Sequence, residues 1–367
     1  MKAVAARDGI IQLTRGVPAV EAFPTEAIIE CTAQALRDHG DTLLQYHPVR
    51  GFVPLRQTLA EQIAVSVDQI FVGNGSIQIL DSLTHALFEP GDTILVERPT
   101  YDRTVTTFRR AGLHVKGVSL DGDGMNLDEL EDAIGAHAPK ALYVIPDFQN
   151  PSGVTTSLAK REAILELAHR HRFLIVADTP YRLLRYEGED VTGFRELRAE
   201  RVVELSSFSK LISPGLRVGW MVASKAIVDR VAQVAVDTYI SPSMLSHGAV
   251  YEFLRRGWMP DNIERLKALY GPRLRATLAA LSSSLPAVAR SHPEGGFFLA
   301  LTLPEGVSGE QMCQLAPQEG LELTRGEGFY ADGDGSRFLR LPFCALREDE
   351  IKEAVSRLAR VLERAEA

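Results

Sequence analysis

The middle of the chain alternates short apolar runs with amphipathic stretches, and this alternation limits the possible fold more than any other feature. Runs typical of strands lie at residues 69–72, 93–96, 141–145, 173–176 and 202–205. Runs typical of helices lie between them, at residues 77–88, 127–134 and 158–171. Strands that alternate with helices form a mostly parallel sheet with helices packed on its faces. This part of the sequence therefore predicts an α/β domain.

The last third of the chain has a different pattern. Residues 262–281 read as an amphipathic helix, which we expect to kink or break at Gly271-Pro272 because proline removes a helical hydrogen bond. Residues 296–301 and 337–341 read as strands of a smaller sheet, and a final helix is expected from residue 348 to about residue 366. The pattern predicts a second, smaller α+β domain.

A chain of 367 residues is long enough for two hydrophobic cores. We expect residues 1–40 to form an N-terminal arm and part of the small domain. Residues 41–240 would form the large domain, and residues 241–367 a connecting helix and the rest of the small domain.

Composition limits the partners and the location of the protein. The formal net charge of -8 argues against a general binder of nucleic acid or anionic membranes, which need a basic surface. The three cysteines (Cys31, Cys313 and Cys344) lie far apart, which is typical of reduced thiols inside a cell. Neither a signal peptide nor a membrane-spanning segment is recognisable, so we expect a cytoplasmic protein. His169 and His171 would not face one another on a helix, and we expect no metal site.

The segment that follows residues 202–205 contains a candidate reactive lysine. Ser207 and Ser209 precede Lys210, and Arg217 follows it. A lysine that forms a Schiff base must lose its proton, which burial or a nearby cation favours. Hydroxyl groups and a guanidinium group suit a phosphate. Together these residues indicate pyridoxal phosphate, although a solvated lysine on a loop is the alternative.

A possible anion site follows residues 69–72. The segment Gly73-Asn74-Gly75-Ser76 leads into a helix, whose first N–H groups would be free to bind a phosphate. Ser76 would serve equally well as a helix N-cap. With Glu97 at the end of the next strand, the glycines also resemble a dinucleotide-binding fingerprint, but Gln78 replaces its third glycine. A nicotinamide enzyme is therefore an alternative, in which Lys210 has no role.

Polar residues also follow the other predicted strands, where ligands of open α/β sheets bind. Asp178 ends a buried run, and a protonated pyridine nitrogen would supply the partner that a buried carboxylate needs. Tyr181 and Asn150 would reach a ring oxygen, although Asn150 also begins a turn sequence, Asn-Pro-Ser-Gly. Tyr101 would stack on a flat cofactor, or would simply begin a helix.

These motifs resemble those of a known family. Their order and spacing are similar to fold-type I pyridoxal phosphate enzymes, in particular to class I and II aminotransferases of the branch that contains 2-aminoadipate, kynurenine and branched-chain or aromatic amino acid aminotransferases. The resemblance extends from about residue 11 to the C-terminus. It implies an aspartate aminotransferase-like fold with a mostly parallel, seven-stranded sheet in the large domain. Two further segments fit it: residues 45–56, which contain Tyr46, and Phe338-Leu339-Arg340-Leu341.

The resemblance also implies a role for each residue. Lys210 would hold the cofactor as a Schiff base and move the substrate α-proton, and Asp178 would pair with the pyridine nitrogen. Asn150 and Tyr181 would bind the ring oxygen, and Tyr101 would stack on the ring. The remaining cofactor contacts would come from Gly75, Ser76, Ile77, Ser207, Ser209 and Arg217, with Tyr46 supplied by the second subunit of a homodimer. Arg340 would bind the substrate α-carboxylate, and Gly16 would line the substrate pocket.

The sequence departs from the family pattern near its N-terminus. Arg15 precedes Gly16 where the family often has a second glycine, so Arg15 would either meet a substrate carboxylate or point to solvent. The leading helix of the family is expected to be shortened or absent. At Ile77, only the backbone amide would contact the phosphate.

We therefore expect an aminotransferase that moves an amino group between an α-amino acid and a 2-oxo acid by a ping-pong mechanism. One alternative is another fold-type I reaction, such as that of a β-lyase, a decarboxylase, or an oxidase or cyclase in specialised biosynthesis. The other is a regulatory ligand sensor without catalysis, since some regulators carry such a domain behind a DNA-binding module. No such module is recognisable here.

Overall fold

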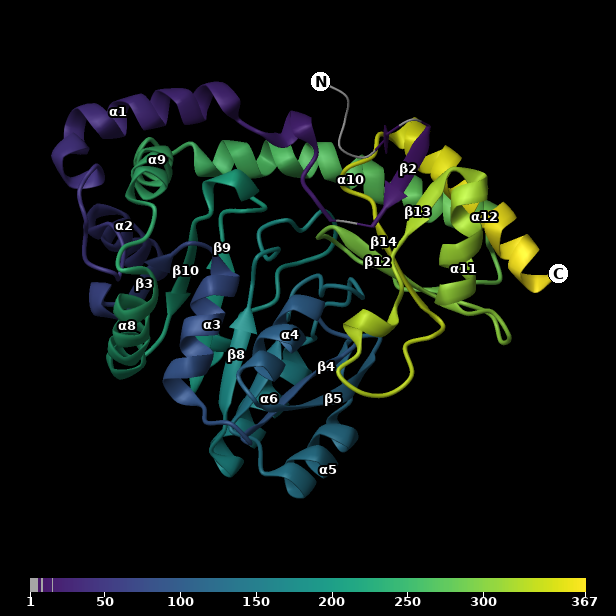
Figure 1. Ribbon diagram of the computed structural model, residues 1–367, viewed down its shortest axis with the longest axis horizontal. Helices are drawn as coiled ribbons and strands as arrows, with labels where there is room; N and C mark the ends of the chain where they lie inside the picture. The colour runs from purple at the N-terminus through teal and green to yellow at the C-terminus, as the bar shows by residue number, and fades with distance from the viewer. Residues whose placement is uncertain (1–5, 8, 15) are drawn as a thin grey trace.

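A large sheet lies at the centre of the computed structural model, which describes residues 6–7, 9–14 and 16–367 (Figure 1). Its strands in spatial order are β3 (Ile70–Gly73), β10 (Gly219–Val222), β9 (Val202–Ser207), β8 (Leu174–Asp178), β7 (Ala141–Val144), β4 (Thr93–Arg98), β5 (His114–Asp121) and β6 (Gly124–Met125). Neighbouring strands from β9 to β5 are parallel, whereas β10 is antiparallel to both of its neighbours. The predicted mostly parallel sheet is confirmed; the two-residue β6 adds an eighth strand to seven longer ones.

Helices cover both faces of this sheet because its strands are apolar on both sides. In β4, Ile94 and Val96 belong to the core on one face of the sheet, to which α3 (Ser76–Leu87), α4 (Asp102–Arg110) and α8 (Lys225–Tyr239) also contribute. Leu95, between them, packs on the other face with α5 (Leu127–His137) and α6 (Leu158–His171). This alternation is what the period of a β-strand requires. The helices predicted around residues 77–88, 127–134 and 158–171 are present.

A second core joins the two ends of the chain. One small sheet consists of β11 (Ala289–Arg290), β12 (Phe298–Thr302) and β14 (Phe338–Pro342), and another of β1 (Ala6–Arg7), β2 (Ile10–Leu13) and β13 (Leu321–Leu323). Since β2 pairs with β13, the N-terminal segment lies within the C-terminal part of the fold. The helices α11 (Gly309–Leu315) and α12 (Glu348–Glu366) enclose this core. The predicted final helix is confirmed.

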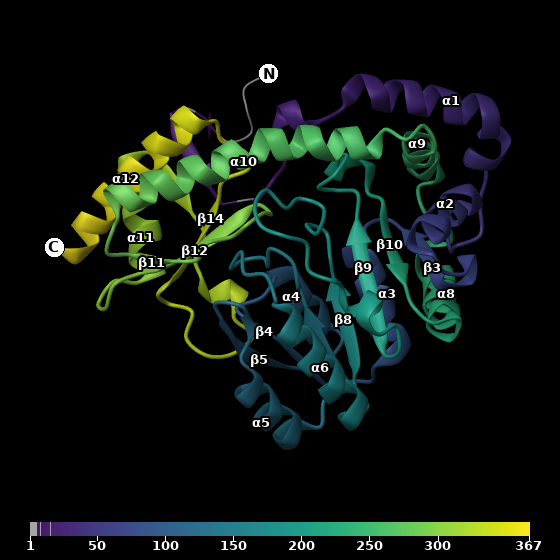
Figure 2. The ribbon, with the colours of Figure 1, turned by 180° about the vertical axis from the view of Figure 1, so that it is seen from behind.

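The long helix α10 (Met259–Ser284) connects the two parts of the molecule (Figure 2). Of the expected kink or break at Gly271-Pro272, the break is wrong, because the helix continues through Pro272; the kink stays a prediction. Tertiary contacts compensate for the missing hydrogen bond. The buried Arg273, one residue further on, donates to the carbonyl of Cys344 and pairs with Glu21.

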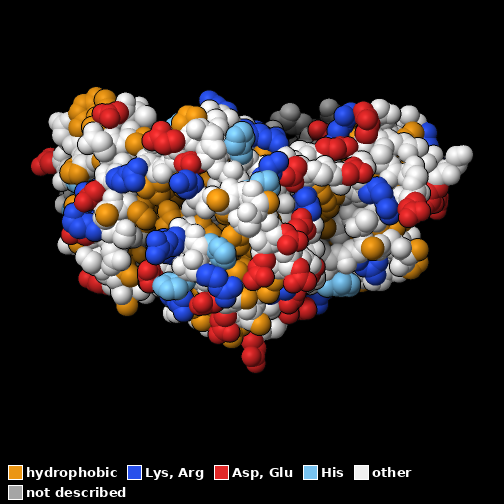
Figure 3. Space-filling model, turned by 90° about the horizontal axis from the view of Figure 1, so that it is seen from below, with side chains coloured by type: hydrophobic (Ala, Val, Ile, Leu, Met, Phe, Trp, Pro, Cys, Tyr) orange, Lys and Arg blue, Asp and Glu red, His pale blue; other side chains and the backbone are white. Residues whose placement is uncertain are grey.

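The helices α1 (Thr25–Leu43), α2 (Val53–Ile63) and α9 (Met244–Arg255) form a group at the opposite end from α12 (Figures 1 and 2). The division of the chain at residues 40 and 240 stays a prediction; its first boundary falls beside His39, where α1 departs from helical angles. In the described residues, no helix has the length and apolarity needed to span a membrane. Acidic and basic side chains are mixed on the face seen in Figure 3.

Candidate active site

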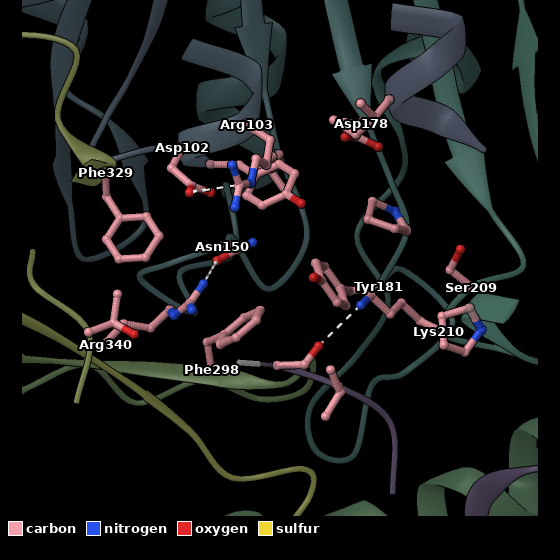
Figure 4. A pocket seen from close by; sticks show the side chains of 18 of the residues that line it. Asp102, Arg103, Asn150, Asp178, Tyr181, Ser209, Lys210, Phe298, Phe329 and Arg340 are labelled. Atoms are coloured by element: carbon pink, nitrogen blue, oxygen red, sulfur yellow. Dashed lines mark hydrogen bonds and ion pairs between the residues drawn. The ribbon is translucent and has the colours of Figure 1, made fainter. Parts of the chain in front are cut away.

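A cavity of about 710 Å³ lies beyond the carboxyl ends of the large sheet and is closed on one side by β12 and β14. This is where ligands of open α/β sheets bind. The structure brings most of the predicted residues to its wall (Figure 4): Gly16, Ser76, Ile77, Tyr101, Asn150, Asp178, Tyr181, Ser207, Ser209, Lys210, Arg217 and Arg340. Gly75 is not itself in the wall but lies against Arg217, which is. Tyr46 lies elsewhere, 78% exposed, and Arg15 lies outside the described residues.

Lys210 occupies the loop after β9 and projects into this cavity. Its Nζ donates a hydrogen bond to the backbone oxygen of Gly16, 3.2 Å away. Burial lowers the pKa of Lys210, and the charges of Arg340 and Arg217 lower it further. A lysine with a lowered pKa has a larger neutral fraction, and only the neutral amine attacks a carbonyl carbon.

Asp178, at the end of β8, has one oxygen that no described residue satisfies. Its Oδ2 accepts a hydrogen bond from the hydroxyl of Tyr143, 2.8 Å away, whereas its buried Oδ1 has no partner. Burial raises the pKa of Asp178 to about 6. A buried carboxylate oxygen without a partner is costly, so a ligand in the cavity that offers a donor would stabilise it. A protonated pyridine nitrogen fits this requirement.

The end of the cavity beside the start of α3 is suited to an anion. Gly75, not Ser76, is the N-cap of α3, so Ser76 does not cap the helix with its side chain. Without a side-chain cap, the first amide N–H groups of α3 remain available to a phosphate. The Oγ of Ser207 donates to the Oγ of Ser209, 2.7 Å away. Arg217 donates to Ser209 and to the carbonyl of Asn74, which places its guanidinium beside this helix end.

Arg340 projects from β14 and is held between two aromatic rings. Its guanidinium carbon lies 4.6 Å from the ring centroids of both Phe298 and Phe329. Nη1 donates to Asn150 Oδ1 over 3.1 Å, and Nη2 donates to the carbonyl of Thr14. Figure 4 shows Arg340 beside Asn150, between the labelled phenylalanines. A guanidinium group fixed in this way suits the bidentate binding of a carboxylate.

Gly16 allows this aromatic arrangement. A Cβ atom at this position would collide with the ring of Phe298, so any side chain would displace the ring from Arg340. Tyr181 is almost fully buried, and its ring centroid lies 6.0 Å from Lys210 Nζ. Tyr101 lines the same cavity just before α4.

The dinucleotide alternative does not agree with the structure. Glu97, which would have to bind a ribose, is 1% exposed and does not line the cavity. Its Oε2 accepts hydrogen bonds from the Ile145 amide and from Gln149 Nε2, each over 3.0 Å. Burial raises the pKa of Glu97 to about 8.

Sequence reasoning missed Phe298, Phe329, Thr14 and Tyr143. Phe298 and Tyr143 fall within predicted strands, but period-2 alternation alone does not tell which strand residues meet a ligand. Thr14 is brought to the cavity by the pairing of β2 with β13, and Phe329 lies beside Thr100, whose amide donates to its carbonyl. No local pattern predicts either contact. For Tyr143, the signal was a hydroxyl-bearing residue inside an otherwise apolar run, because a buried Tyr hydroxyl needs a partner.

Comparison with known proteins identifies the family. The family model for aminotransferase class I and II matches residues 8–358. The chain is 36% identical to aromatic-amino-acid aminotransferase 1 of Thermococcus litoralis, over 96% of this chain and 88% of the relative. It is 35% identical to 2-aminoadipate transaminase of Thermus thermophilus, over 97% of this chain and 91% of the relative.

The fold agrees with these matches. The structure of α-aminoadipate aminotransferase from Thermus thermophilus, complexed with N-(5'-phosphopyridoxyl)-L-leucine, superposes with a TM-score of 0.93. That comparison has 34% identity and covers 98% of this chain and 93% of the other. The predicted aspartate aminotransferase-like fold and the predicted amino-group transfer are confirmed. The chain belongs to the class I and II aminotransferases.

Proposed function

We propose that the cavity binds pyridoxal 5'-phosphate and uses it to transfer an amino group between an α-amino acid and a 2-oxo acid. The observation that carries this proposal is the unpartnered Oδ1 of Asp178, which lies in the wall of the same cavity as the half-buried Lys210. The anion-binding end, formed by the start of α3 and Arg217, supports the proposal. Pyridoxal phosphate would use all three features: the free oxygen of Asp178, the amine of Lys210 and the anion site.

The cofactor, when bound, supplies an electron-accepting ring that stabilises the carbanion formed when a substrate loses its α-proton. Asp178 would hold the proton at the ring nitrogen. Lys210 would hold the cofactor at its aldehyde group, and its amine, when free, would carry the substrate α-proton. Asn150 and Tyr181 would donate hydrogen bonds to the ring oxygen; since Asn150 Oδ1 accepts from Arg340, its Nδ2 is the donor. Tyr101 would stack on the ring.

The phosphate would be held by two segments. The first comprises Gly75, Ser76 and the Ile77 amide, and the second Ser207, Ser209 and Arg217. Arg340 would bind the α-carboxylate of the amino acid or 2-oxo acid, with Gly16 beneath the substrate. The role of Arg15 toward a substrate side chain stays a prediction.

A homodimer would complete this site. Tyr46, between α1 and α2, is 78% exposed, and apolar side chains of α1, α2 and α9 and at the ends of α1 and α8 are exposed as well: Ile29, Leu44, Val53, Ile240 and Leu245. A set of exposed apolar residues is typical of a surface that a partner covers. We propose that a second copy covers it and receives Tyr46 at its phosphate.

The visible absorption spectrum tests the cofactor assignment. The purified protein should show the absorption of lysine-bound pyridoxal phosphate, and Lys210→Ala should not. Adding amino acids one at a time should bleach that absorption for true substrates. A wild-type protein without the chromophore, or a Lys210→Ala variant that keeps it, would contradict the proposal.

Product analysis separates transfer from the alternatives. Stoichiometric conversion of an added 2-oxo acid to its amino acid supports transfer. Release of ammonia or CO₂ instead would indicate a lyase or a decarboxylase, and tight DNA binding without turnover would indicate a regulatory sensor.

A further inference from the structure

Behind the cavity wall, a tyrosine on the neighbouring strand contacts the carboxylate of Asp178. Tyr143 lies on β7 opposite Val176 of β8, two residues before Asp178, so both side chains project from the same face of the sheet. The Tyr143 hydroxyl donates to Asp178 Oδ2 over 2.8 Å, and both residues are buried. The Tyr143 ring packs edge-on against Phe108, with 6.0 Å between centroids. This packing and the strand pairing together fix the position of the hydroxyl.

Because of this hydrogen bond, the two oxygens of the Asp178 carboxylate differ in their surroundings. Oδ2 is satisfied from behind, inside the protein, and only Oδ1 remains without a partner at the cavity. Without the Tyr143 hydroxyl, neither oxygen would have a donor among the described residues. A carboxylate in that position would become neutral more easily, because burial without hydrogen bonds disfavours its charged form.

Other groups that face Asp178 do not replace this donor. Glu97 comes from β4, but its pKa is raised to about 8 by burial, and its own hydrogen bonds join it to Ile145 and Gln149. Tyr101 and Tyr181 lie on the cavity side, and neither makes a hydrogen bond to Asp178 in the described structure. Thr104 of α4 lies beside the Tyr143 hydroxyl rather than beside the carboxylate. The cations that line the cavity have other partners. Lys210 donates to Gly16, Arg340 to Asn150 and Arg217 to Ser209. Arg103 pairs with Asp102, and Arg325 with Glu310.

We propose that Tyr143 is a positioning residue, which keeps Asp178 ionised and orients its Oδ1 toward the ring nitrogen of the bound cofactor. The inference rests on the proposed function, since it assumes pyridoxal phosphate in this cavity. Tyr143 does not line the cavity, so its effect on the cofactor passes through Asp178.

Two cofactor ligands distinguish this role from a merely structural one. Cofactor-free wild-type protein and Tyr143→Phe are titrated with pyridoxal phosphate and with its 1-deaza analogue, in which a carbon replaces the ring nitrogen. The variant should bind pyridoxal phosphate about tenfold more weakly, the usual worth of a hydrogen bond to a charged group. The deaza analogue has no nitrogen to meet Asp178, so the two proteins should bind it equally. Affinity for pyridoxal phosphate should fall at low pH, where Asp178 becomes protonated. In the variant this fall should occur at higher pH than in wild type, because Asp178 lacks the hydrogen bond from Tyr143.

Tyr186→Phe is the matched control, because it removes a tyrosine hydroxyl that donates to Gly296 O away from the cavity. It should leave both affinities unchanged. Equal losses of affinity for the two ligands in Tyr143→Phe would overturn the proposal in favour of a general packing defect. An unchanged affinity for pyridoxal phosphate would also overturn it. Should Tyr143→Phe not fold, Asp178→Asn supplies the test: it should show the same selective loss, and equal weakening of both ligands would overturn the proposal. A wild-type protein that binds neither ligand would overturn the proposed function itself.

Discussion

Gly75 and Arg217 approach so closely that a Cβ atom on Gly75 would collide with the guanidinium group of Arg217. Gly75 also has a φ of +99°, a conformation that glycine adopts without steric cost. The guanidinium group donates to Asn74 and Ser209, which belong to the two segments proposed to hold the phosphate. The absence of a side chain at Gly75 therefore sets where the positive charge lies.

Gly75→Ala should weaken the binding of pyridoxal phosphate at least tenfold, because Arg217 would be displaced. A charge-assisted hydrogen bond is worth about 1.5–3 kcal/mol. Gly91→Ala is a suitable control, since Gly91 has a similar φ of +95° but nothing within 4 Å of an added Cβ. Both variants should lose about 1 kcal/mol or more of stability from the strained backbone. Equal cofactor affinity in the two variants would show that Arg217 does not depend on Gly75.

Arg340→Lys should raise the KM for both amino acid and 2-oxo acid by about 10- to 100-fold, because lysine cannot make a bidentate contact or lie flat between two rings. The affinity for the cofactor should change little. Arg337→Lys, an exposed position just before the same strand, should leave KM unchanged. Steady-state kinetics with both substrates measures the effect. A fall in kcat alone would argue against a carboxylate-binding role.

Glu97→Gln should change how stability depends on pH. Burial raises the pKa of Glu97 from 4.5 to about 8, so between these values the folded state holds a proton that the unfolded state has lost. The contribution of this group to stability is therefore fully present at low pH and falls as pH rises through this window. Glutamine resembles the protonated form, and each unit of pKa shift corresponds to about 1.4 kcal/mol. At pH 9 the variant should be more stable than wild type by several kcal/mol.

Denaturant unfolding between pH 5 and pH 9 measures this difference. The exposed Glu162→Gln serves as the control and should follow the wild-type curve. If Glu97→Gln is less stable at both ends of the range, the side chain is needed as a charged acceptor for Ile145 and Gln149, and the assigned protonation is wrong.

Tyr46 can be assigned to its site by mixing subunits. The Lys210→Ala variant should be inactive. The Tyr46→Ala variant should be strongly impaired when the concentration of pyridoxal phosphate is low. In a mixed dimer, one site would combine Lys210 with an intact Tyr46 from the other subunit, so unfolding and refolding the two variants together should restore part of the activity. If Tyr46 served its own subunit, no site in the mixture would be intact, and activity would not return.

The sequence predicted the residues at strand ends better than the contacts between distant segments. Lys210 and Asp178 could be identified because a lysine or a carboxylate next to a buried apolar run is unusual and needs a chemical reason. The rings of Phe298 and Phe329 could not, because they meet Arg340 only after three separate segments have folded together. The continuation of α10 through Pro272 had no local signal either, since contacts made by Arg273 hold the helix there.

The reversed direction of β10 has a consequence for the integrity of the site. Gly219, its first residue, is paired with Ser207, the last residue of β9, so the chain returns after only eleven residues and without a crossover helix. That short hairpin connection contains both Lys210 and Arg217, which would hold two neighbouring groups of one small molecule, its aldehyde and its phosphate. A single cleavage or insertion in residues 208–218 would thus disturb the contacts to the aldehyde and to the phosphate together.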